Sequence, residues 1–129
     1  MQVLPLAHAR VWIAASTLLV VALVYASLGP SVPAPAVDNS DKLGHFLAYA
    51  TLAAWFGGLL PRSRYGWIAL ALGGLGLALE ILQHTMGRGR VGDPYDMAAN
   101  LAGVVAGLLL GLRLTGGWAV GFEAWLARR

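Results

Sequence analysis

Long apolar stretches alternate with short polar ones along almost the whole chain. Four of these stretches, at about 11–28, 42–60, 67–86 and 95–114, are long enough for a helix to cross a membrane. A hydrocarbon core of about 30 Å requires about 20 helical residues. The Pro-rich segment "GPSVPAPAVDNSD" follows the first stretch and is expected to be an extended loop, and Pro61 ends the second. The pattern therefore predicts an all-α polytopic membrane protein with four transmembrane helices.

The C-terminal tail "GGWAVGFEAWLARR" is too short to span a membrane but has its own helical period. Trp118, Phe122, Trp125 and Leu126 fall at i, i+4, i+7 and i+8, on one face of a helix. Tryptophans on that face, with arginines at the end, are typical of a helix that lies in the membrane interface. We expect a short interfacial helix after the four spans, all within one domain of residues 1–129.

The composition agrees with this prediction. The chain has 129 residues, of which 58% are hydrophobic and only 12% charged, about half the charged fraction of a soluble domain. It contains no cysteine, which excludes disulfides and thiolate chemistry. The net charge of +3 is better explained by membrane topology than by nucleic-acid binding, so we expect no nucleic-acid partner. A cleaved signal peptide is the alternative for the first stretch, but its 18 or so apolar residues exceed the usual length.

The arginines predict the orientation, because cytoplasmic loops carry an excess of Lys and Arg. With both termini in the cytoplasm, the inner side holds most of the basic residues, namely Arg10, Arg62, Arg64, Arg113, Arg128 and Arg129. The outer side then holds Lys42, Arg88 and Arg90. We therefore expect both termini inside and the first and third loops outside.

This topology gathers the polar residues of three helices at the outer face. Asp41, His45 and Tyr49 share one face of the second helix at i, i+4 and i+8, with Lys42 beside them at its outer end. Glu80 and Gln83 lie near the outer end of the third helix, with Glu80 roughly 9 Å below that end at 1.5 Å per residue. An ionisable group at that depth is expected to face the bundle and find a partner.

The fourth helix supplies the third polar face. Asp96, Asn100 and Gly103 fall at i, i+4 and i+7, and the stripe continues through Gly107 and Gly111. Small residues at this spacing allow a second helix to approach closely. We expect these faces to turn inward and form a polar site that opens outward.

Each polar residue also has a purely structural interpretation. Asp93 before Pro94 is expected to be a helix N-cap, and Asp96 could complete a capping-box-like pair. Asp41 could simply complement the helix dipole and Lys42 could extend to the interface. Gln83 could only bridge helices, and His84 at the rim is a weak candidate. Arg88 and Arg90 either pair with nearby aspartates or bind a phosphate or carboxylate.

Together, the segments "DKLGHFLAY", "EILQ" and "GRVGDPYDMAANLAG" resemble the VanZ-like membrane protein family over residues 38–112. The resemblance is carried by an Asp-Lys-x-x-His, a Glu-x-x-Gln and an Arg…Asp-x-x-x-Asn-x-x-Gly segment. They correspond to the residues Asp41, Lys42, His45, Glu80, Gln83, Arg90, Asp96, Asn100 and Gly103. An extra arginine in "GRGR" and the Asp93-Pro94 pair depart from the pattern. The resemblance implies a multi-pass protein of the bacterial cytoplasmic membrane, in a family named after a protein linked to low-level resistance to teicoplanin.

Three functions remain open from the sequence. The first is binding of an anionic lipid or polyprenyl-linked envelope precursor by a site that contains Asp41, Lys42, His45, Tyr49, Glu80, Gln83, Arg88, Arg90, Asp96 and Asn100. The second is acid–base catalysis on such a head group, with Glu80, His45 and Asp96 as catalytic candidates. The third, a small transporter, is disfavoured because the inner half lacks a matching polar stripe. We expect no cofactor and no metal, because no close-spaced ligand pair such as HExxH is present, although His45, Glu80 and Asp96 suit a divalent ion in principle.

Overall fold

The computed structural model describes residues 4–29, 40–86 and 93–129, and the described part of the chain is helical with no strand. The long helices agree with the predicted stretches to within a few residues at each end, so the all-α fold is confirmed. The elements are α1 (Ala9–Leu28), α2 (Ser40–Leu59), the 3₁₀ turn η1 (Arg62–Arg64), α3 (Tyr65–Thr85), α4 (Pro94–Leu110), the π-helical turn η2 (Gly111–Thr115) and α5 (Trp118–Leu126).

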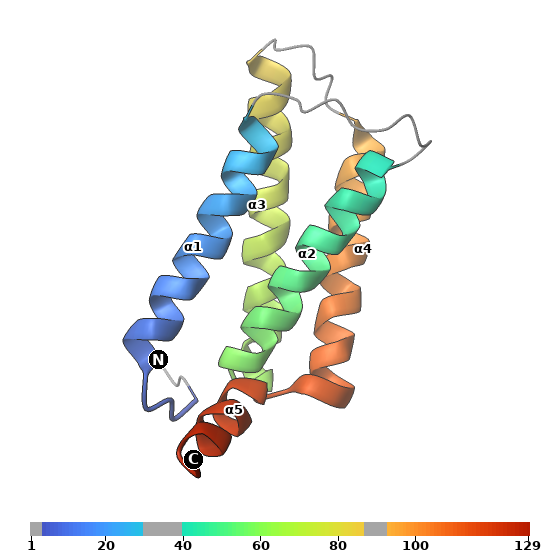
Figure 1. Ribbon diagram of the computed structural model, residues 1–129. Helices are drawn as coiled ribbons and strands as arrows, with labels where there is room; N and C mark the ends of the chain where they lie inside the picture. Colours follow the sequence, from blue (N-terminus) through green and yellow to red (C-terminus); the bar gives the residue numbers. More distant parts are fainter. Residues whose placement is uncertain (1–3, 30–39, 87–92) are drawn as a thin grey trace.

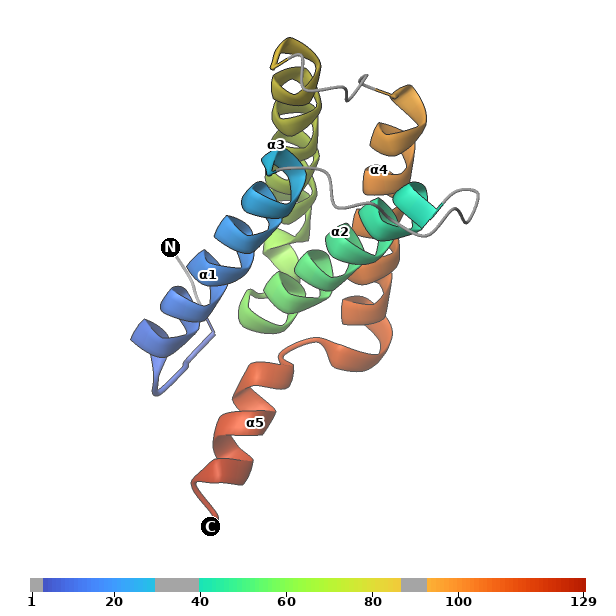
Figure 2. The same ribbon diagram turned by 45° about the horizontal axis from the view of Figure 1, so that its top comes forward.

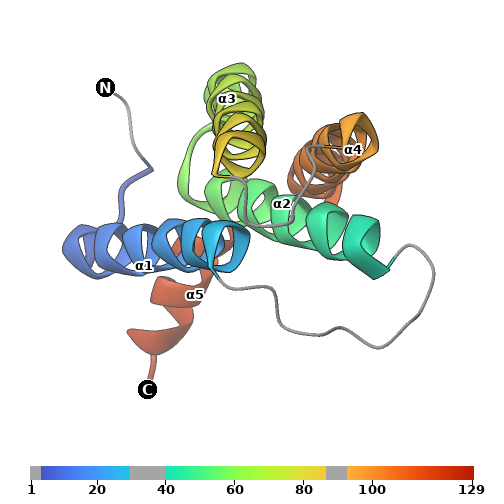
Figure 3. The ribbon, with the colours of Figure 1, turned by 90° about the horizontal axis from the view of Figure 1, so that it is seen from above.

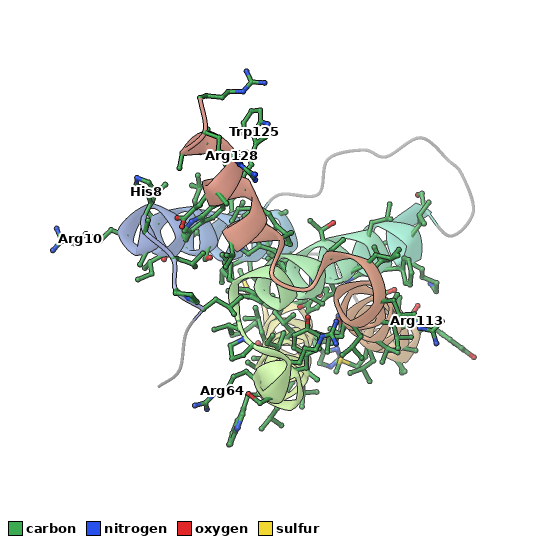
Figure 4. The ribbon with its side chains drawn as sticks, turned by 90° about the horizontal axis from the view of Figure 1, so that it is seen from below. His8, Arg10, Arg64, Arg113, Trp125 and Arg128 are labelled. Atoms are coloured by element: carbon green, nitrogen blue, oxygen red, sulfur yellow. The ribbon has the colours of Figure 1, made fainter. Side chains whose placement is uncertain are left out.

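The four long helices alternate in direction (Figure 1). One end of the bundle, which we call the polar end, contains the last turn of α1, the first turn of α2, the last turn of α3 and the first turn of α4. The opposite end carries arginines from four places in the chain, and Figure 4 shows it from below with Arg10, Arg64, Arg113 and Arg128 around its edge. We call it the arginine-rich end, and α5 lies there.

Three segments are long and apolar enough to cross a membrane, namely Ala9–Leu28, Arg62–Thr85 and Pro94–Thr115. Although α2 has 20 residues, like α1, it is more polar because Asp41, Lys42 and His45 lie in its first two turns. The described residues therefore contain three clear candidate spans, which is consistent with a membrane protein.

The core is built around α2, which contacts α1, α3 and α4, while α1 also contacts α3 (Figure 3). Its buried side chains come from α2, α3 and α4 and comprise Tyr49, Leu52, Ala53, Tyr65, Ile68, Leu72 and Val104. Helix α1 has no buried residue and packs at the periphery. Large apolar side chains on the outward faces of the helices are exposed, for example Tyr25 at 73% and Leu70 at 65%. Such a surface suits lipid contact better than water.

The predicted glycine stripe of α4 lies against α2. A Cβ added to Gly103 would collide with the Phe46 carbonyl oxygen, and one added to Gly107 would collide with the Ala50 carbonyl oxygen. The prediction that these glycines allow a close helix approach is thus confirmed. The third position of the stripe differs, because Gly111 faces the Tyr65 side chain rather than a helix backbone.

The predicted C-terminal helix is present as α5, and it extends away from the bundle (Figure 2). It begins after Gly117, whose φ of 75° lies in the left-handed region that favours glycine. Its first residue, Trp118, packs against Trp12 of α1 and Trp55 of α2, with ring centroids 5.3 and 5.2 Å away. The Glu123 carboxylate accepts hydrogen bonds from the Trp12 indole at 2.8 Å and the His8 amide at 2.9 Å. These contacts join the two ends of the chain at the arginine-rich end.

Candidate functional site

The polar end brings together charged side chains that the sequence separates by about 50 residues. Asp41, Lys42 and His45 come from the first two turns of α2, while Asp93 and Asp96 come from the start of α4. The close approach of these two helices at Gly103 and Gly107, described above, brings the polar faces within contact distance. The sequence prediction that α2 and α4 contribute to one polar group therefore agrees with the geometry.

Lys42 links α2 to the first turn of α4. Its Nζ donates to Asp93 Oδ2 at 3.0 Å and lies 3.7 Å from Asp96 Oδ1. Lys42 and Asp93 are each 35% exposed at the side chain, whereas Asp96 is 10% exposed. The ammonium group thus faces two carboxylates of different burial and holds the helix ends together.

Asp93 has two structural tasks. Its Oδ1 accepts the Tyr95 amide at 2.9 Å, which makes it the N-cap of α4, with Pro94 at the first helical position as predicted. Its Oδ2 accepts from Lys42. The hydrogen bonds from the Tyr95 backbone and from Lys42 lower the pKa of Asp93 below its ordinary value of 3.8. Sequence reasoning identified the cap but missed the lysine contact, and Asp93 was not among the predicted site residues.

His45 lies close to three other polar side chains of the site, from Asn100, Asp41 and Asp96. Its Nδ1 lies 3.0 Å from Asn100 Oδ1. On the other side of the ring, Nε2 lies 3.9 Å from Asp41 Oδ1 and 3.8 Å from Asp96 Oδ2. Because an amide oxygen only accepts hydrogen bonds, this contact requires a proton on Nδ1. In the neutral ring the lone pair is then on Nε2, which is turned toward the two carboxylates.

Beneath His45 the group ends in the buried core. Asn100 is 2% exposed and Tyr49 is 1% exposed. A Cβ on Gly76 of α3 would lie 3.2 Å from both the Asn100 amide nitrogen and the Tyr49 hydroxyl. Both side chains therefore fit because α3 presents a glycine at this point. Tyr49 forms the floor of the site, and Asn100 fixes the orientation of the His45 ring.

Glu80, predicted to belong to the polar site, contacts the backbone of α4 instead of the side chains of that site. Its Oε1 accepts the Asp93 amide at 2.7 Å, so the carboxylate of α3 satisfies a free N–H group at the start of α4. This contact meets the expectation that Glu80 faces the bundle and finds a partner. It gives Glu80 a positioning task, because it holds the N-terminus of α4 against α3.

The remaining predicted residues lie further out. The Gln83 amide donates to the Ser27 carbonyl oxygen of α1 at 2.7 Å, which is the helix-bridging role considered from the sequence. His84 is exposed at the end of α3. Arg88 and Arg90 lie outside the described residues.

The described part of the site is acidic on balance. It contains four carboxylates, from Asp41, Glu80, Asp93 and Asp96, and one lysine, Lys42, which pairs with Asp93 and lies near Asp96. One donor atom from each of Asp41, His45 and Asp96 can be chosen so that all three lie within 4.8 Å of one another. Such a set can exchange protons or hold a cation, and by itself it does not attract an anion.

A large apolar cavity lies elsewhere. It is a partly open cavity of about 810 Å³ between the N-terminal segment, α1 and the end of α2, lined by residues that include Trp12, Val20 and Phe56. It is near the arginine-rich end and contains none of the predicted site residues. The polar site is consequently a separate feature of the opposite end.

Comparison of the chain with protein-family models, with curated proteins and with solved structures gives no match.

Proposed function

We propose that this protein is a four-span protein of the bacterial cytoplasmic membrane whose polar end faces outward and binds an anionic lipid or a lipid-linked envelope precursor. The observation that carries the location of the proposed site is the unequal distribution of polar groups, whereas the anionic nature of the ligand rests on Arg88 and Arg90. Charged and amide side chains of α2, α3 and α4 meet at one end of a bundle that is otherwise apolar on the outside.

A fourth span is supported by the path of the chain. Helix α1 ends at the polar end and α3 begins at the arginine-rich end, so the intervening chain has to return over the same distance (Figure 1). The 20 residues of α2 cover roughly 30 Å at 1.5 Å per residue, which equals the thickness of a hydrocarbon core. The polar first turns of α2 would then lie at the membrane surface, where charged groups are tolerated.

The orientation follows from the positive-inside tendency. Arg10, Arg62, Arg64 and Arg113 belong to the arginine-rich end, where α5 and both terminal segments also lie. Placing this end in the cytoplasm directs the polar site outward and makes α5 an interfacial helix.

The nature of the ligand rests on the basic residues of the outer loop and on the resemblance to the VanZ-like family. Lys42 is engaged with Asp93, so Arg90, with Arg88 beside it, is the residue we expect to hold a phosphate or carboxylate. The residues of the family segments include Asp41, His45 and Asp96, whose side chains lie together here. A contribution to glycopeptide resistance is a further hypothesis, tested by the susceptibility of a deletion strain.

Native mass spectrometry of the gently solubilised protein tests ligand binding directly. We expect the wild-type protein to carry an anionic lipid or a polyprenyl phosphate and Arg90→Ala to lose most of it, roughly tenfold or more, since a charge-assisted contact contributes about 1.5–3 kcal/mol. Arg113→Ala removes the same charge from the opposite end and should retain the ligand. Absence of any such species from the wild type, or equal loss from both variants, would contradict the proposal.

Acid–base catalysis on the same ligand is the second candidate function. It is favoured by the position of His45 Nε2 beside the buried Asp96 carboxylate, where the ring can accept or donate a proton. If a captured ligand is converted over time by the wild type but not by His45→Gln, the site is catalytic. Glu80, the other candidate base, is occupied by the Asp93 amide and is better suited to positioning.

A further inference from the structure

We propose that Asp41, His45 and Asp96 form a binding site for a divalent transition-metal cation of the Zn²⁺ or Mn²⁺ class. This inference goes beyond the proposed function and does not depend on lipid binding. It also differs from the metal set considered from the sequence, because Asp41 takes the place of Glu80, whose carboxylate is directed to the Asp93 amide.

The three donor atoms surround a common point. His45 Nε2 lies 3.9 Å from Asp41 Oδ1 and 3.8 Å from Asp96 Oδ2, too far for hydrogen bonds. Ligands at about 2.1 Å from a tetrahedral ion are roughly 3.4 Å apart. The two separations from His45 therefore need to close by about 0.5 Å, and the separation between the two carboxylates, which is within 4.8 Å, needs to close by at most about 1.4 Å. Asp41, whose side chain is 71% exposed, has the freedom to make this adjustment.

The histidine is already prepared to act as a ligand. Its Nδ1 proton is directed to the Asn100 amide oxygen at 3.0 Å, so Nε2, which is turned toward the carboxylates, is the nitrogen that the neutral ring offers to a metal. Metal-binding histidines almost always donate their other ring N–H to such an acceptor, because this contact fixes both tautomer and ring orientation. Asn100, at 2% exposed, is itself held by the core.

Asp96 provides an independent indication. Its side chain is 10% exposed, and its buried Oδ1 accepts no hydrogen bond within the described ranges. The Lys42 ammonium stands 3.7 Å from Oδ1, while Oδ2 faces His45. A buried carboxylate without a hydrogen bond is costly. A cation bound between Asp96 Oδ2 and His45 Nε2 would neutralise the negative charge of Asp96, to which Lys42 makes no hydrogen bond.

The donor set defines the class of ion. One imidazole nitrogen and two carboxylate oxygens suit Zn²⁺ or Mn²⁺, whereas Mg²⁺ and Ca²⁺ favour oxygen ligands alone. Three protein ligands leave at least one coordination position open to water or to an oxygen of a bound molecule. The open position would lie at the exposed Asp41 side of the site, at the polar end.

The test is titration of the full chain in detergent with Zn²⁺ or Mn²⁺, by isothermal titration calorimetry and by metal analysis after dialysis. We expect one ion per chain, and an affinity at least about tenfold weaker in His45→Gln and in Asp41→Asn. His84→Gln is the matched control, because it removes an exposed histidine from the same end without touching the three ligands. Bound metal should also raise the melting temperature of the wild type, as any ligand of the folded state does.

Two outcomes would overturn the site. One is a wild type that binds neither ion more tightly than His45→Gln does, and the other is an equal loss in His84→Gln. Asp41→Asn keeps the test sound if the histidine variant fails to fold, since residue 41 is exposed. Failure of metal binding leaves the lipid experiment unaffected, because that experiment depends on Arg90 and contains no added metal.

Discussion

At the residue scale, the polar end shows how one side chain gains a second task from its surroundings. Asp93 caps α4 through Tyr95, a local contact two residues away. The same carboxylate accepts from Lys42, a contact across 51 residues of sequence. The first contact follows from local sequence chemistry, while the second depends on how α2 and α4 pack.

The lowered pKa of Asp93 predicts the direction of a pH effect. Because the folded-state pKa lies below the ordinary value of 3.8, the stabilising contribution is present above that value and is lost as the pH falls through the lowered one. Asp93→Asn keeps a good N-cap but removes the charge that pairs with Lys42. We expect the melting temperature of the variant in detergent to change less than that of the wild type as the pH falls below about 4. Parallel profiles for the two proteins would show that the Lys42 contact contributes nothing.

At the element scale, the contact between α2 and α4 determines the geometry of the site. Gly103 and Gly107 bring the two helix backbones together directly below the polar residues. A side chain at either position would push the helices apart and separate Lys42 from Asp93. The packing of small residues and the assembly of the polar group are thus the same structural feature.

Substitution of Gly107 tests this dependence. Gly107→Val would place its side chain against the Ala50 carbonyl oxygen, and we expect a loss of about 1–3 kcal/mol in the free energy of unfolding from overpacking. Gly74→Ala is the control, because its Cβ would meet nothing within 4 Å. As a helical Gly→Ala change, the control should be neutral or stabilise by about 0.5–1 kcal/mol. Chemical denaturation or thermal melting in detergent measures both, and an equal effect of the two variants would contradict the role of the stripe.

At the scale of the whole molecule, the described arginines and the polar group lie at opposite ends of the bundle. Any orientation of the protein in a membrane has to account for this separation. Both terminal segments lie at the arginine-rich end, where Glu123 of α5 accepts the His8 amide. An even number of crossings is required to return the chain to the same side. Three segments are clear candidate spans, so the position of α2 decides the topology.

Cysteine labelling resolves the topology because the chain contains no native cysteine. Ser40 is the first residue of α2 and Ser63 follows its last turn in η1, so Ser40→Cys and Ser63→Cys form a matched pair at the two ends of this helix. The cells have an intact cytoplasmic membrane and an outer layer that the reagent can pass. We expect a maleimide that does not cross the cytoplasmic membrane to label residue 40 in these cells, and to label residue 63 only after the cytoplasmic membrane is opened. Labelling of both residues from the same side would mean that α2 does not cross.

The sequence by itself determined the helices and their ends. Apolar stretches of about 20 residues, Pro61 and the Asp93-Pro94 pair act locally, so the helix bounds and the cap of α4 were predictable. The stripe through Gly103 and Gly107 also indicated a close helix contact in advance. Periodicity shows which face of a helix is polar, but it does not give the rotation or depth of that helix against its neighbours.

Only the tertiary structure decided which polar groups meet. It directs Glu80 to the Asp93 amide and Gln83 to the Ser27 carbonyl oxygen, although both were predicted to belong to the polar site. It also brings Asp96 to the ring nitrogen of His45 that the local i,i+4 spacing already places near Asp41. A shift of one helix by a single turn, about 5.4 Å, would exchange these partners. The side-chain pairs therefore depend on packing between distant segments, which the helical pattern alone does not encode.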